Sequence, residues 1–406
     1  MKKLFLIILA VMLFTSCSML QKGPFTPKMK TGLDVLSEEN FVRLDGKRIG
    51  LISNHSAVDR DGNSILELMK QSDNVNLAAI FAPEHGFGGS AEEQIKDQKD
   101  PQTGLMIYSL YDDTKRPTKE ELEGIDLLIF DIQDIGARFY TYTSTMAMCM
   151  EEAARYDIDF MVLDRPNPIS GLRVGGPLQD PDLYESFTAY FPMPIIHGMT
   201  IGELAMMFNE YYGVQCDLTI VQMEGWKRAM YFDDTGLPWV NPSPNIRNVK
   251  QAILYPGIAL TEAWNSNVSV GRGTETPFEL MGAPWINAEE FVEEMNSRNI
   301  PGFKLTPVHY TPDAAKFPGE ECHGMYVEIT DRQDMDIIGL GLHMLSALHK
   351  LYPDTYKLMP NRGLVGSTRV MQMIEQGASM DQIRAVYSQD LNKFIKARNN
   401  FILYKL

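Results

Sequence analysis

Apolar and polar residues follow one another along the first half of the chain in a pattern that predicts strands separated by helices. Short, continuously apolar runs predict four strands, at residues 49–53, 77–81, 125–130 and 160–163. Continuous rather than alternating apolar runs indicate strands buried on both faces, as in parallel sheets covered by helices. We therefore expect an α/β fold with a doubly wound, mostly parallel sheet.

Helix-start signals fall between and after these strands. A serine or threonine three residues before a glutamate forms a capping box at Ser64–Glu67 and again at Thr200–Glu203, and such a pair satisfies the free N–H groups of a helix start. A further helix is expected across residues 145–156, before the fourth strand. Helices thus alternate with strands, which is the order of a doubly wound fold.

The pattern changes near residue 250, where glycine and proline become frequent. Two β-type runs follow at 303–308 and 325–330, and three amphipathic helices complete the chain. These helices are expected near residues 336–351, 365–376 and 380–398. We therefore expect an N-terminal domain at residues 31–250 and a smaller α+β domain at residues 251–406.

The first 17 residues have the features of a bacterial lipoprotein signal. Two lysines precede an apolar stretch too short to span a bilayer, and small residues then lead to Cys17. The segment resembles a lipobox, in which cleavage before the cysteine is followed by acylation of its sulfur; an ordinary secretory signal is the alternative. We expect a signal peptide at residues 1–16, a tether at 17–30, and lipid anchoring in the bacterial cell envelope, facing the periplasm.

Composition limits the possible functions. The 406 residues are 44% hydrophobic and 22% charged, which is typical of a globular protein. The formal net charge is −16 and no run of lysines or arginines stands out, so we expect no nucleic-acid partner. The four cysteines are far apart and lack CxxC spacing, which argues against a zinc site and a disulfide framework. We expect Cys149 to be a buried apolar residue.

Each predicted strand leads directly into a cluster of polar residues. The four clusters lie at residues 53–55, 83–89, 131–140 and 164–168. In open α/β sheets, ligands bind beyond the carboxyl ends of the strands. We therefore expect the four clusters to converge on one cleft.

Several common chemistries lack their motifs in this chain. There is no GxGxxG after the first strand, no P-loop and no GxSxG nucleophile elbow, and we expect no cofactor. A metal site drawn from His55, His85, Asp131, Asp164 and His197 lacks the ligand spacing of known metal motifs. We therefore assign no metal ligands, and a metal-dependent hydrolase is a less favoured alternative.

Carboxylates at the strand ends favour glycan chemistry. Glu84 follows a hydrophobic strand and precedes a glycine-rich loop, an environment that partly desolvates the carboxyl group and suits it to general acid catalysis. Asp131, Asp134 and Asp164 are candidates for a second carboxylate. Six aromatic residues are candidates for stacking on a sugar ring: Tyr140, Tyr142, Trp226, Trp239, Trp264 and Trp285. These residues predict a glycan-cleaving or glycan-binding cleft.

Together the motifs resemble the exo-β-N-acetylmuramidases of bacterial cell-wall turnover. The resemblance runs from about residue 35 to the C-terminus and rests on segments that occur in this order: 83–87, 131–140, 164–168, 197–203, 241–245, 255–257 and 261–274. Members of this family release terminal N-acetylmuramic acid from the non-reducing end of peptidoglycan fragments. The resemblance implies a Rossmann-like N-terminal domain, a smaller C-terminal domain and an active cleft between them.

The resemblance also implies catalytic roles. Glu84, in the family's Glu-His-Gly motif, would protonate the glycosidic oxygen. Asp131 or Asp134 would supply the second catalytic carboxylate, and Glu262 is a third candidate. Alternatively, the 2-acetamido group of the substrate would act as the nucleophile, which removes the need for a second carboxylate.

Muramic acid carries a lactyl carboxylate that distinguishes it from N-acetylglucosamine. Arg138 or Arg272 would bind this carboxylate, although each arginine could instead clamp two loops together. His85 and His197 would orient Glu84 or contact sugar hydroxyls. The expected substrate-binding residues are Asn54, His55, His85, Arg138, Tyr140, Asp164, Arg165, Asn167, His197, Asn245, Glu262, Asn265 and Arg272. A non-catalytic lipoprotein that captures muropeptides with these residues is the alternative function.

Overall fold

A computed structural model describes residues 29–89, 96–101, 103–111 and 114–406. The expected signal peptide and the lipidation site Cys17 lie outside the described residues. Within the described part of the chain, no helix combines the length and the apolar character needed to cross a membrane.

The N-terminal domain is built on a seven-stranded sheet with the strand order β3-β4-β2-β1-β5-β6-β7. Every neighbouring pair is parallel except β3 and β4, which are antiparallel. The strands are β1 (Arg48–Ser53), β2 (Asn76–Ala82), β3 (Gln98–Lys99), β4 (Met106–Ser109), β5 (Leu127–Asp131), β6 (Asp159–Leu163) and β7 (Leu218–Val221). The predicted α/β class and the four predicted strands are confirmed.

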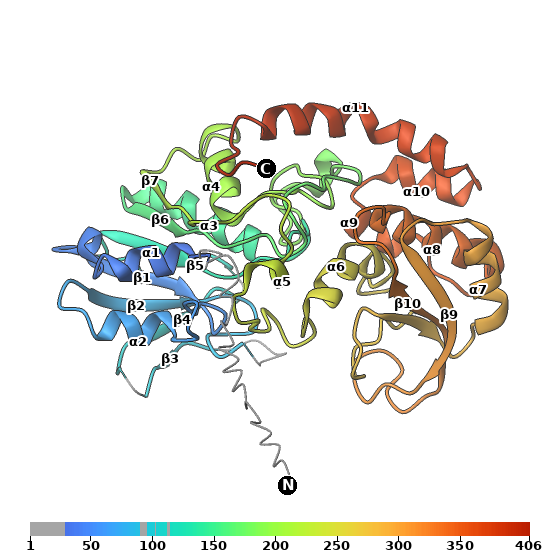
Figure 1. Cartoon of the computed structure of the whole chain (residues 1–406), viewed down its shortest axis with the longest axis horizontal. Helices are drawn as coiled ribbons and strands as arrows, with labels where there is room; N and C mark the ends of the chain where they lie inside the picture. Colours follow the sequence, from blue (N-terminus) through green and yellow to red (C-terminus); the bar gives the residue numbers. More distant parts are fainter. Residues whose placement is uncertain (1–28, 90–95, 102, 112–113) are drawn as a thin grey trace, which may run out of the picture.

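Helices cover both faces of this sheet, as Figure 1 shows. The helices of this domain are α1 (Gly32–Glu38), α2 (Ile65–Lys70), α3 (Tyr142–Tyr156), α4 (Ile201–Glu210) and the short α5 (Phe232–Thr235). Alternate residues of each central strand point to opposite faces. Ile49 and Leu51 pack with α1 and α2 in one core cluster, whereas Ile52 packs with α3 and α4 in another. The capping boxes predicted at Ser64 and Thr200 both form.

The C-terminal domain has a three-stranded antiparallel sheet of order β8-β10-β9, packed against helices. Its elements are α6 (Val249–Ile258), β8 (Leu280–Ala283), α7 (Ala288–Ser297), β9 (Phe303–Tyr310), β10 (Cys322–Ile329), α8 (Ile337–Leu351), α9 (Arg362–Val365), α10 (Thr368–Glu375) and α11 (Met380–Arg398). Both predicted β runs and all three predicted helices are present. The second, smaller α+β domain is therefore confirmed.

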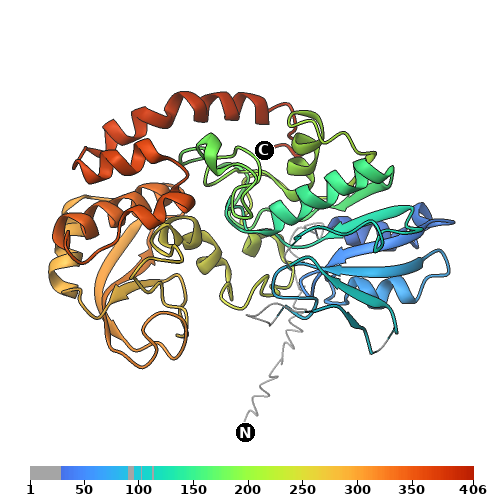
Figure 2. The ribbon, with the colours of Figure 1, turned by 180° about the vertical axis from the view of Figure 1, so that it is seen from behind.

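Helix α11 connects the two domains. It leaves the C-terminal domain, crosses one side of the molecule and brings the end of the chain back to α4, which is visible in both views (Figures 1 and 2). There the Leu403 N–H donates to Glu203 Oε1 at 2.9 Å, and the Met223 N–H donates to the Tyr404 hydroxyl at 2.9 Å. The last residues of the chain therefore pack in the N-terminal domain, and α11 bridges the two lobes.

Candidate active site

The loops that follow β1, β2, β5 and β6 lie at one edge of the sheet because these strands are parallel neighbours. The chain passes from β1 to β2 on one side and later returns to β5 on the other side of β1. Ser53 and Asp131 are register partners at this topological switch point. Doubly wound sheets bind their ligands at such points, so the four polar clusters meet where a site is expected.

Glu84 lies on a tight turn directly after β2. The next two residues, His85 and Gly86, both have a φ angle of 71°. A left-handed conformation is unfavourable for a residue with a side chain, and strain of this kind is concentrated at functional positions. Glu84 is half-buried, and its Oε2 accepts a hydrogen bond from Thr141 Oγ1 at 2.6 Å. The turn and Thr141 together fix the position of the carboxyl group.

Two tyrosines surround the same carboxyl group. The pKa of Tyr111 is raised to about 12, first by burial and then by the charge of Glu84 and a hydrogen bond to it. Burial and the Glu84 charge also raise the pKa of Tyr142. The Tyr142 hydroxyl accepts from Asn54 Nδ2 at 3.1 Å and donates to the Pro242 carbonyl at 2.7 Å. Both phenols therefore stay protonated at neutral pH and serve as hydrogen-bond donors at the site.

His55 forms another wall of this site. Its Nε2 donates to the Asn241 carbonyl at 2.6 Å, and its backbone N–H donates to the Phe87 carbonyl at 2.8 Å. Its ring occupies the space where a Cβ of Gly89 would lie, only 1.7 Å from the imidazole Cε1. Burial lowers the pKa of His55, and the neighbouring His85 lowers it further. His55 is therefore neutral at neutral pH and joins the loops after β1 and β2 to Asn241.

A chain of aromatic rings extends from the Glu84 region into the C-terminal domain. The ring of Tyr140 lies 4.9 Å from Tyr142 and 5.8 Å from Tyr255, and Tyr255 lies 4.7 Å from Phe278. Arg272 stacks over Phe278 at 5.1 Å. Tyr140 is 7% exposed, so it is mainly a packing residue. The contacts place residues of both domains around one site.

Arg272 is an arginine of this site that remains partly accessible. Its guanidinium pairs with the Glu262 carboxylate through Nε and through Nη2, the latter at 3.2 Å. The Arg272 side chain is 34% exposed, and within the described part of the chain its Nη1 has no hydrogen bond. The charges of Glu262, Tyr255 and Glu84 all raise the pKa of Arg272, against the opposing effect of burial. The free edge of the guanidinium can accept a ligand carboxylate.

Asp134 forms a buried pair with His197. The Asp134 Oδ2 atom lies 3.4 Å from His197 Nε2 and accepts a hydrogen bond from the Gly136 N–H at 2.7 Å. His197 Nδ1 accepts from the Met199 N–H at 3.2 Å, which assigns the ring proton to Nε2. The second oxygen, Asp134 Oδ1, is buried without a hydrogen-bond partner among the described residues. Asp134 is 4% exposed, so this oxygen is an unsatisfied acceptor in the interior of the protein.

The structure corrects the catalytic role expected for Asp131. Asp131 is fully buried, and both of its oxygens bind the guanidinium of Arg165, at 2.5 Å and 2.9 Å. Arg165 is itself 5% exposed and also donates to the Val58 carbonyl. A buried, bidentate ion pair leaves neither group available to a substrate. Both residues therefore connect the loops after β5 and β6 instead of contacting ligand.

Arg138 is likewise structural, which corrects its assignment to the lactyl carboxylate. The side chain is fully buried. Its Nη1 donates to the carbonyls of Pro177 and Met193, each at 2.9 Å, and its Nη2 donates to the Leu364 carbonyl at 2.6 Å. Burial lowers the pKa of Arg138 to about 9. The residue clamps loops of the N-terminal domain to α9, the alternative considered for it from sequence.

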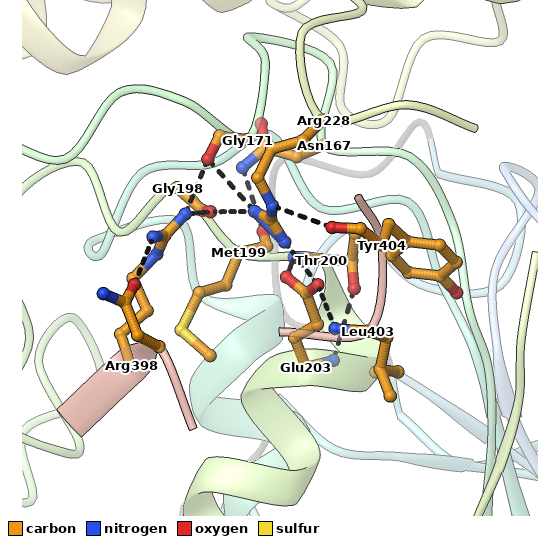
Figure 3. A network of polar contacts seen from close by, with 12 residues as sticks. Asn167, Gly171, Gly198, Met199, Thr200, Glu203, Arg228, Arg398, Leu403 and Tyr404 are labelled. Carbon is orange, nitrogen blue, oxygen red and sulfur yellow. Dashed lines mark hydrogen bonds and ion pairs between the residues drawn. The ribbon is translucent and has the colours of Figure 1, made fainter. Parts of the chain in front are cut away.

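The loops after β6 and before α4 build the polar network that holds the end of the chain (Figure 3). Asp164 accepts hydrogen bonds from Thr200 Oγ1 at 2.8 Å and from the Tyr404 hydroxyl at 2.6 Å. Arg228 pairs with Glu203, and Arg398 donates to the Gly171 carbonyl at 2.6 Å. Asn167 donates to the Met199 carbonyl at 2.9 Å. Asp164 and Asn167, which were expected to bind substrate, thus make hydrogen bonds within the protein; their binding roles stay predictions.

The remaining expected site residues divide by exposure. Asn54 is 1% exposed and Asn245 is 7% exposed, whereas Asn265 is exposed and His85 is half-buried. Sequence reasoning did not single out Thr141, Tyr111 and Tyr255. The sequence did contain a clue to Tyr255, because this residue lies in one of the family segments. No sequence pattern pointed to Thr141 or Tyr111.

The cysteines and metal-binding residue types show no further site in the described ranges. Cys149, Cys216 and Cys322 are buried free thiols, and Cys149 is the buried apolar residue predicted from sequence. Among residues 29–89, 96–101, 103–111 and 114–406, no group of three or more His, Cys, Asp and Glu side chains is placed to hold a metal ion.

Comparison with known proteins gives consistent matches. The N-terminal family model of the exo-β-N-acetylmuramidase NamZ matches residues 49–250, and the C-terminal model matches residues 253–404. The peptidoglycan β-N-acetylmuramidase NamZ of Bacillus subtilis (strain 168) is 42% identical over 383 residues, which cover 93% of this chain and 92% of the relative.

Two crystal structures of DUF1343 family proteins from Bacteroides fragilis are also similar. One superposes with a TM-score of 0.87 at 35% identity and covers 94% of this chain and all of its own. The other has a TM-score of 0.73 at 32% identity and covers 93% of this chain and 99% of its own. Each comparison extends over both domains.

Proposed function

The chain belongs to the exo-β-N-acetylmuramidase NamZ family, and we propose that it releases terminal N-acetylmuramic acid from the non-reducing end of peptidoglycan fragments. It is a glycosidase of peptidoglycan turnover. The observation that carries the site assignment is the position of Glu84, on a strained turn after β2 at the carboxyl edge of the sheet, with hydroxyl groups of Thr141 and Tyr111 at its carboxyl group.

In the proposed reaction Glu84 acts as the general acid. Its proton passes to the glycosidic oxygen while the bond between that oxygen and C1 of the muramic acid breaks, and the sugar ring develops oxocarbenium character. Thr141 and Tyr111 fix the position of the carboxyl group. A fixed position matters because a general acid must lie within hydrogen-bond reach of the oxygen that it protonates. Water then adds to C1, and its proton goes to a base.

We propose Asp134 as the second carboxylate. Asp131 and Glu262, two of the other candidates, each use both oxygens to bind an arginine. Asp134 instead has one oxygen without a partner among the described residues, while the Gly136 N–H fixes the other. In the proposed reaction Asp134 is the base that takes the proton of the water. In the competing route, in which the substrate's acetamido group is the nucleophile, Asp134 would instead orient that group.

We propose that Arg272 binds the lactyl carboxylate of muramic acid. Arg138 is fully buried and unavailable to substrate, whereas Arg272 is 34% exposed and uses only one edge of its guanidinium for Glu262. A guanidinium and a carboxylate form parallel hydrogen bonds that also fix their orientation. The lactyl group is what distinguishes muramic acid from N-acetylglucosamine, so this contact would supply selectivity.

The direct test of the proposed function uses a disaccharide of N-acetylmuramic acid linked β-1,4 to N-acetylglucosamine. Incubation with the protein should release both free sugars, measured by chromatography. The disaccharide with the opposite order, which has N-acetylglucosamine at the non-reducing end, should remain intact. Binding of the first disaccharide without release of free sugar would instead support the non-catalytic muropeptide-binding alternative and contradict the proposed function.

We also propose that Cys17 carries a lipid anchor that retains the protein in the cell envelope, facing the periplasm. Support comes from the sequence alone, where a basic start, a short apolar stretch and small residues precede Cys17. Radiolabelled palmitate supplied to a bacterial expression host should label the protein, and Cys17→Ala should abolish the label. Equal labelling of the two proteins would contradict the proposal.

A further inference from the structure

Trp264 differs from the other tryptophans of the chain. Trp226 is 4% exposed, and Trp239 and Trp285 pack against the main hydrophobic core. Trp264 is 91% exposed, more than any other large hydrophobic residue among those the structure describes. Placing an indole ring in water forgoes the large stabilisation that its burial would give. Single exposed apolar residues are common on protein surfaces, so the surroundings of Trp264 decide whether its exposure serves a function.

The backbone around Trp264 is held firmly. The Ala263 N–H donates to the side chain of Asn361, a fully buried residue, at 3.2 Å. Lys316 Nζ donates to the carbonyls of Trp264 and Ser266, each at 2.9 Å. The Ser266 N–H closes a turn onto the Ala263 carbonyl at 2.8 Å. The indole is thus presented to solvent by an ordered loop, an arrangement typical of a preorganised contact surface.

This loop belongs to the surroundings of the candidate active site. Trp264 follows Glu262 by two residues, a span of at most about 7 Å between Cα atoms. Glu262 is the ion-pair partner of Arg272, and the charge of Lys316 also acts on Glu262. Arg272 in turn interacts with the charge of Glu84. The backbone of Trp264 is therefore close to the group of residues assigned to the terminal sugar.

We propose that Trp264 is the stacking platform for the sugar that follows the terminal N-acetylmuramic acid, a pyranose at the leaving-group side of the cleaved bond. The inference rests on the proposed function. An enzyme that removes a terminal sugar holds that sugar next to its acid, Glu84, and the remaining glycan must extend outward to solvent. The C–H face of a pyranose is apolar and flat, and it fits the exposed face of an indole.

The test uses Glu84→Gln protein, which should bind glycan without cleaving it, and the intrinsic fluorescence of the exposed tryptophan. Titration with the N-acetylmuramic acid–N-acetylglucosamine disaccharide should shift the emission to shorter wavelength because the sugar removes water from the indole. N-acetylmuramic acid alone should give no such shift. In the same background, Trp264→Ala should raise the Kd of the disaccharide about 3- to 10-fold and Trp264→Phe should restore most of the affinity, while both should abolish the shift.

Tyr211→Ala provides a matched control, since Tyr211 is an aromatic residue 57% exposed at the end of α4, and it should leave the Kd unchanged. The Kd of each variant for the disaccharide should be measured by calorimetry, which does not depend on the fluorescence of Trp264. An unchanged Kd in Trp264→Ala, or equal spectral shifts with both sugars, would overturn the platform assignment while cleavage by the wild-type protein continued. Failure of the proposed function has a different signature, in which the wild-type protein releases no N-acetylmuramic acid.

Discussion

Two arginines that were equivalent candidates by sequence occupy opposite environments in the folded protein. Arg138 is fully buried and, among the described residues, donates to the backbone carbonyls of Pro177, Met193 and Leu364. Arg272 is 34% exposed and carries its charge beside Glu262. Both follow apolar segments and both lie in family motifs, so sequence gave no means of separating them. Burial, a property of the whole fold, decides which one can meet a substrate carboxylate.

Arg272→Lys should raise KM for the muramic acid disaccharide at least tenfold and change kcat much less. Lysine keeps the charge but loses the planar pair of donors, and a hydrogen bond to a charged group contributes about 1.5–3 kcal/mol. The measurement is steady-state kinetics of N-acetylmuramic acid release.

Arg332→Lys is a closely matched control. Arg332 also pairs with a carboxylate, that of Asp233, and its side chain is 37% exposed. It stacks on Tyr231 at 5.2 Å, much as Arg272 stacks on Phe278. Arg332→Lys should leave KM within twofold of wild type. Equal KM values for wild type and Arg272→Lys would remove Arg272 from the lactyl site.

Asp134→Asn should lower kcat by about 10²–10⁴-fold, the usual contribution of a carboxylate that moves a proton in the transition state. Asparagine keeps the shape and the hydrogen bond from Gly136 but has no negative charge. Activity should be measured with saturating disaccharide, and circular dichroism should verify folding. A kcat within a few-fold of wild type would contradict proton transfer by Asp134 and favour the route through the substrate's acetamido group.

At the scale of elements, the end of α11 and the loops after β6 form one structural unit. Asp164, at the end of β6, accepts hydrogen bonds from the Tyr404 hydroxyl, from Thr200 Oγ1 and from the N–H of Gly202. Burial raises the pKa of Asp164 to about 7, with the charge of Glu203 adding to the shift and the hydrogen bonds opposing it. The attachment of α11 to the N-terminal domain therefore includes a titratable group.

This group predicts a pH dependence of stability. Unfolded Asp164 releases its proton near pH 4, whereas the folded protein retains it up to about pH 7. The folded state binds the extra proton in this window, so the contribution of Asp164 to the free energy of unfolding falls as pH rises from 4 to 7. The slope is at most about 1.4 kcal/mol per pH unit.

Asp164→Asn should remove this contribution, because an amide does not titrate. The free energy of unfolding of wild type minus that of Asp164→Asn, measured by urea denaturation, should decline between pH 4.5 and pH 7. The exposed Asp73 offers a control, since Asp73→Asn should follow wild type across the range. Parallel pH curves for wild type and Asp164→Asn would show that the carboxyl group is not the source.

At the scale of the whole molecule, apolar runs were sufficient to predict the central parallel strands. The spacing of a serine or threonine to a glutamate predicted the capping boxes at Ser64 and Thr200, and amphipathic patterns predicted the C-terminal helices. Strands β3, β4 and β7 were missed because they are short and are exposed or only partly buried. Strand β8 was also missed, although all four of its residues are buried, because it is short and follows a segment rich in glycine and proline. The sequence also predicted which loops would meet, since parallel strands end at one edge. It could not predict which polar groups of those loops pair with one another, as Asp131 does with Arg165.

That limitation has a physical origin. A polar residue after a buried strand has the same sequence pattern whether it faces a substrate or neutralises a buried partner. Asp131 ends strand β5 and Asp134 lies three residues later in the loop that follows. Yet both oxygens of Asp131 bind a guanidinium, whereas one oxygen of Asp134 has no hydrogen-bond partner among the described residues. Only the three-dimensional arrangement of the loops distinguishes them.

The central claim is that Glu84 donates the proton that cleaves the glycosidic bond. The most direct test is the rate of N-acetylmuramic acid release by Glu84→Gln at saturating disaccharide, with binding of the same disaccharide measured by calorimetry. We predict at least a 100-fold loss of kcat with the Kd retained within a few-fold. Turnover by Glu84→Gln at a rate close to that of wild type would contradict the account.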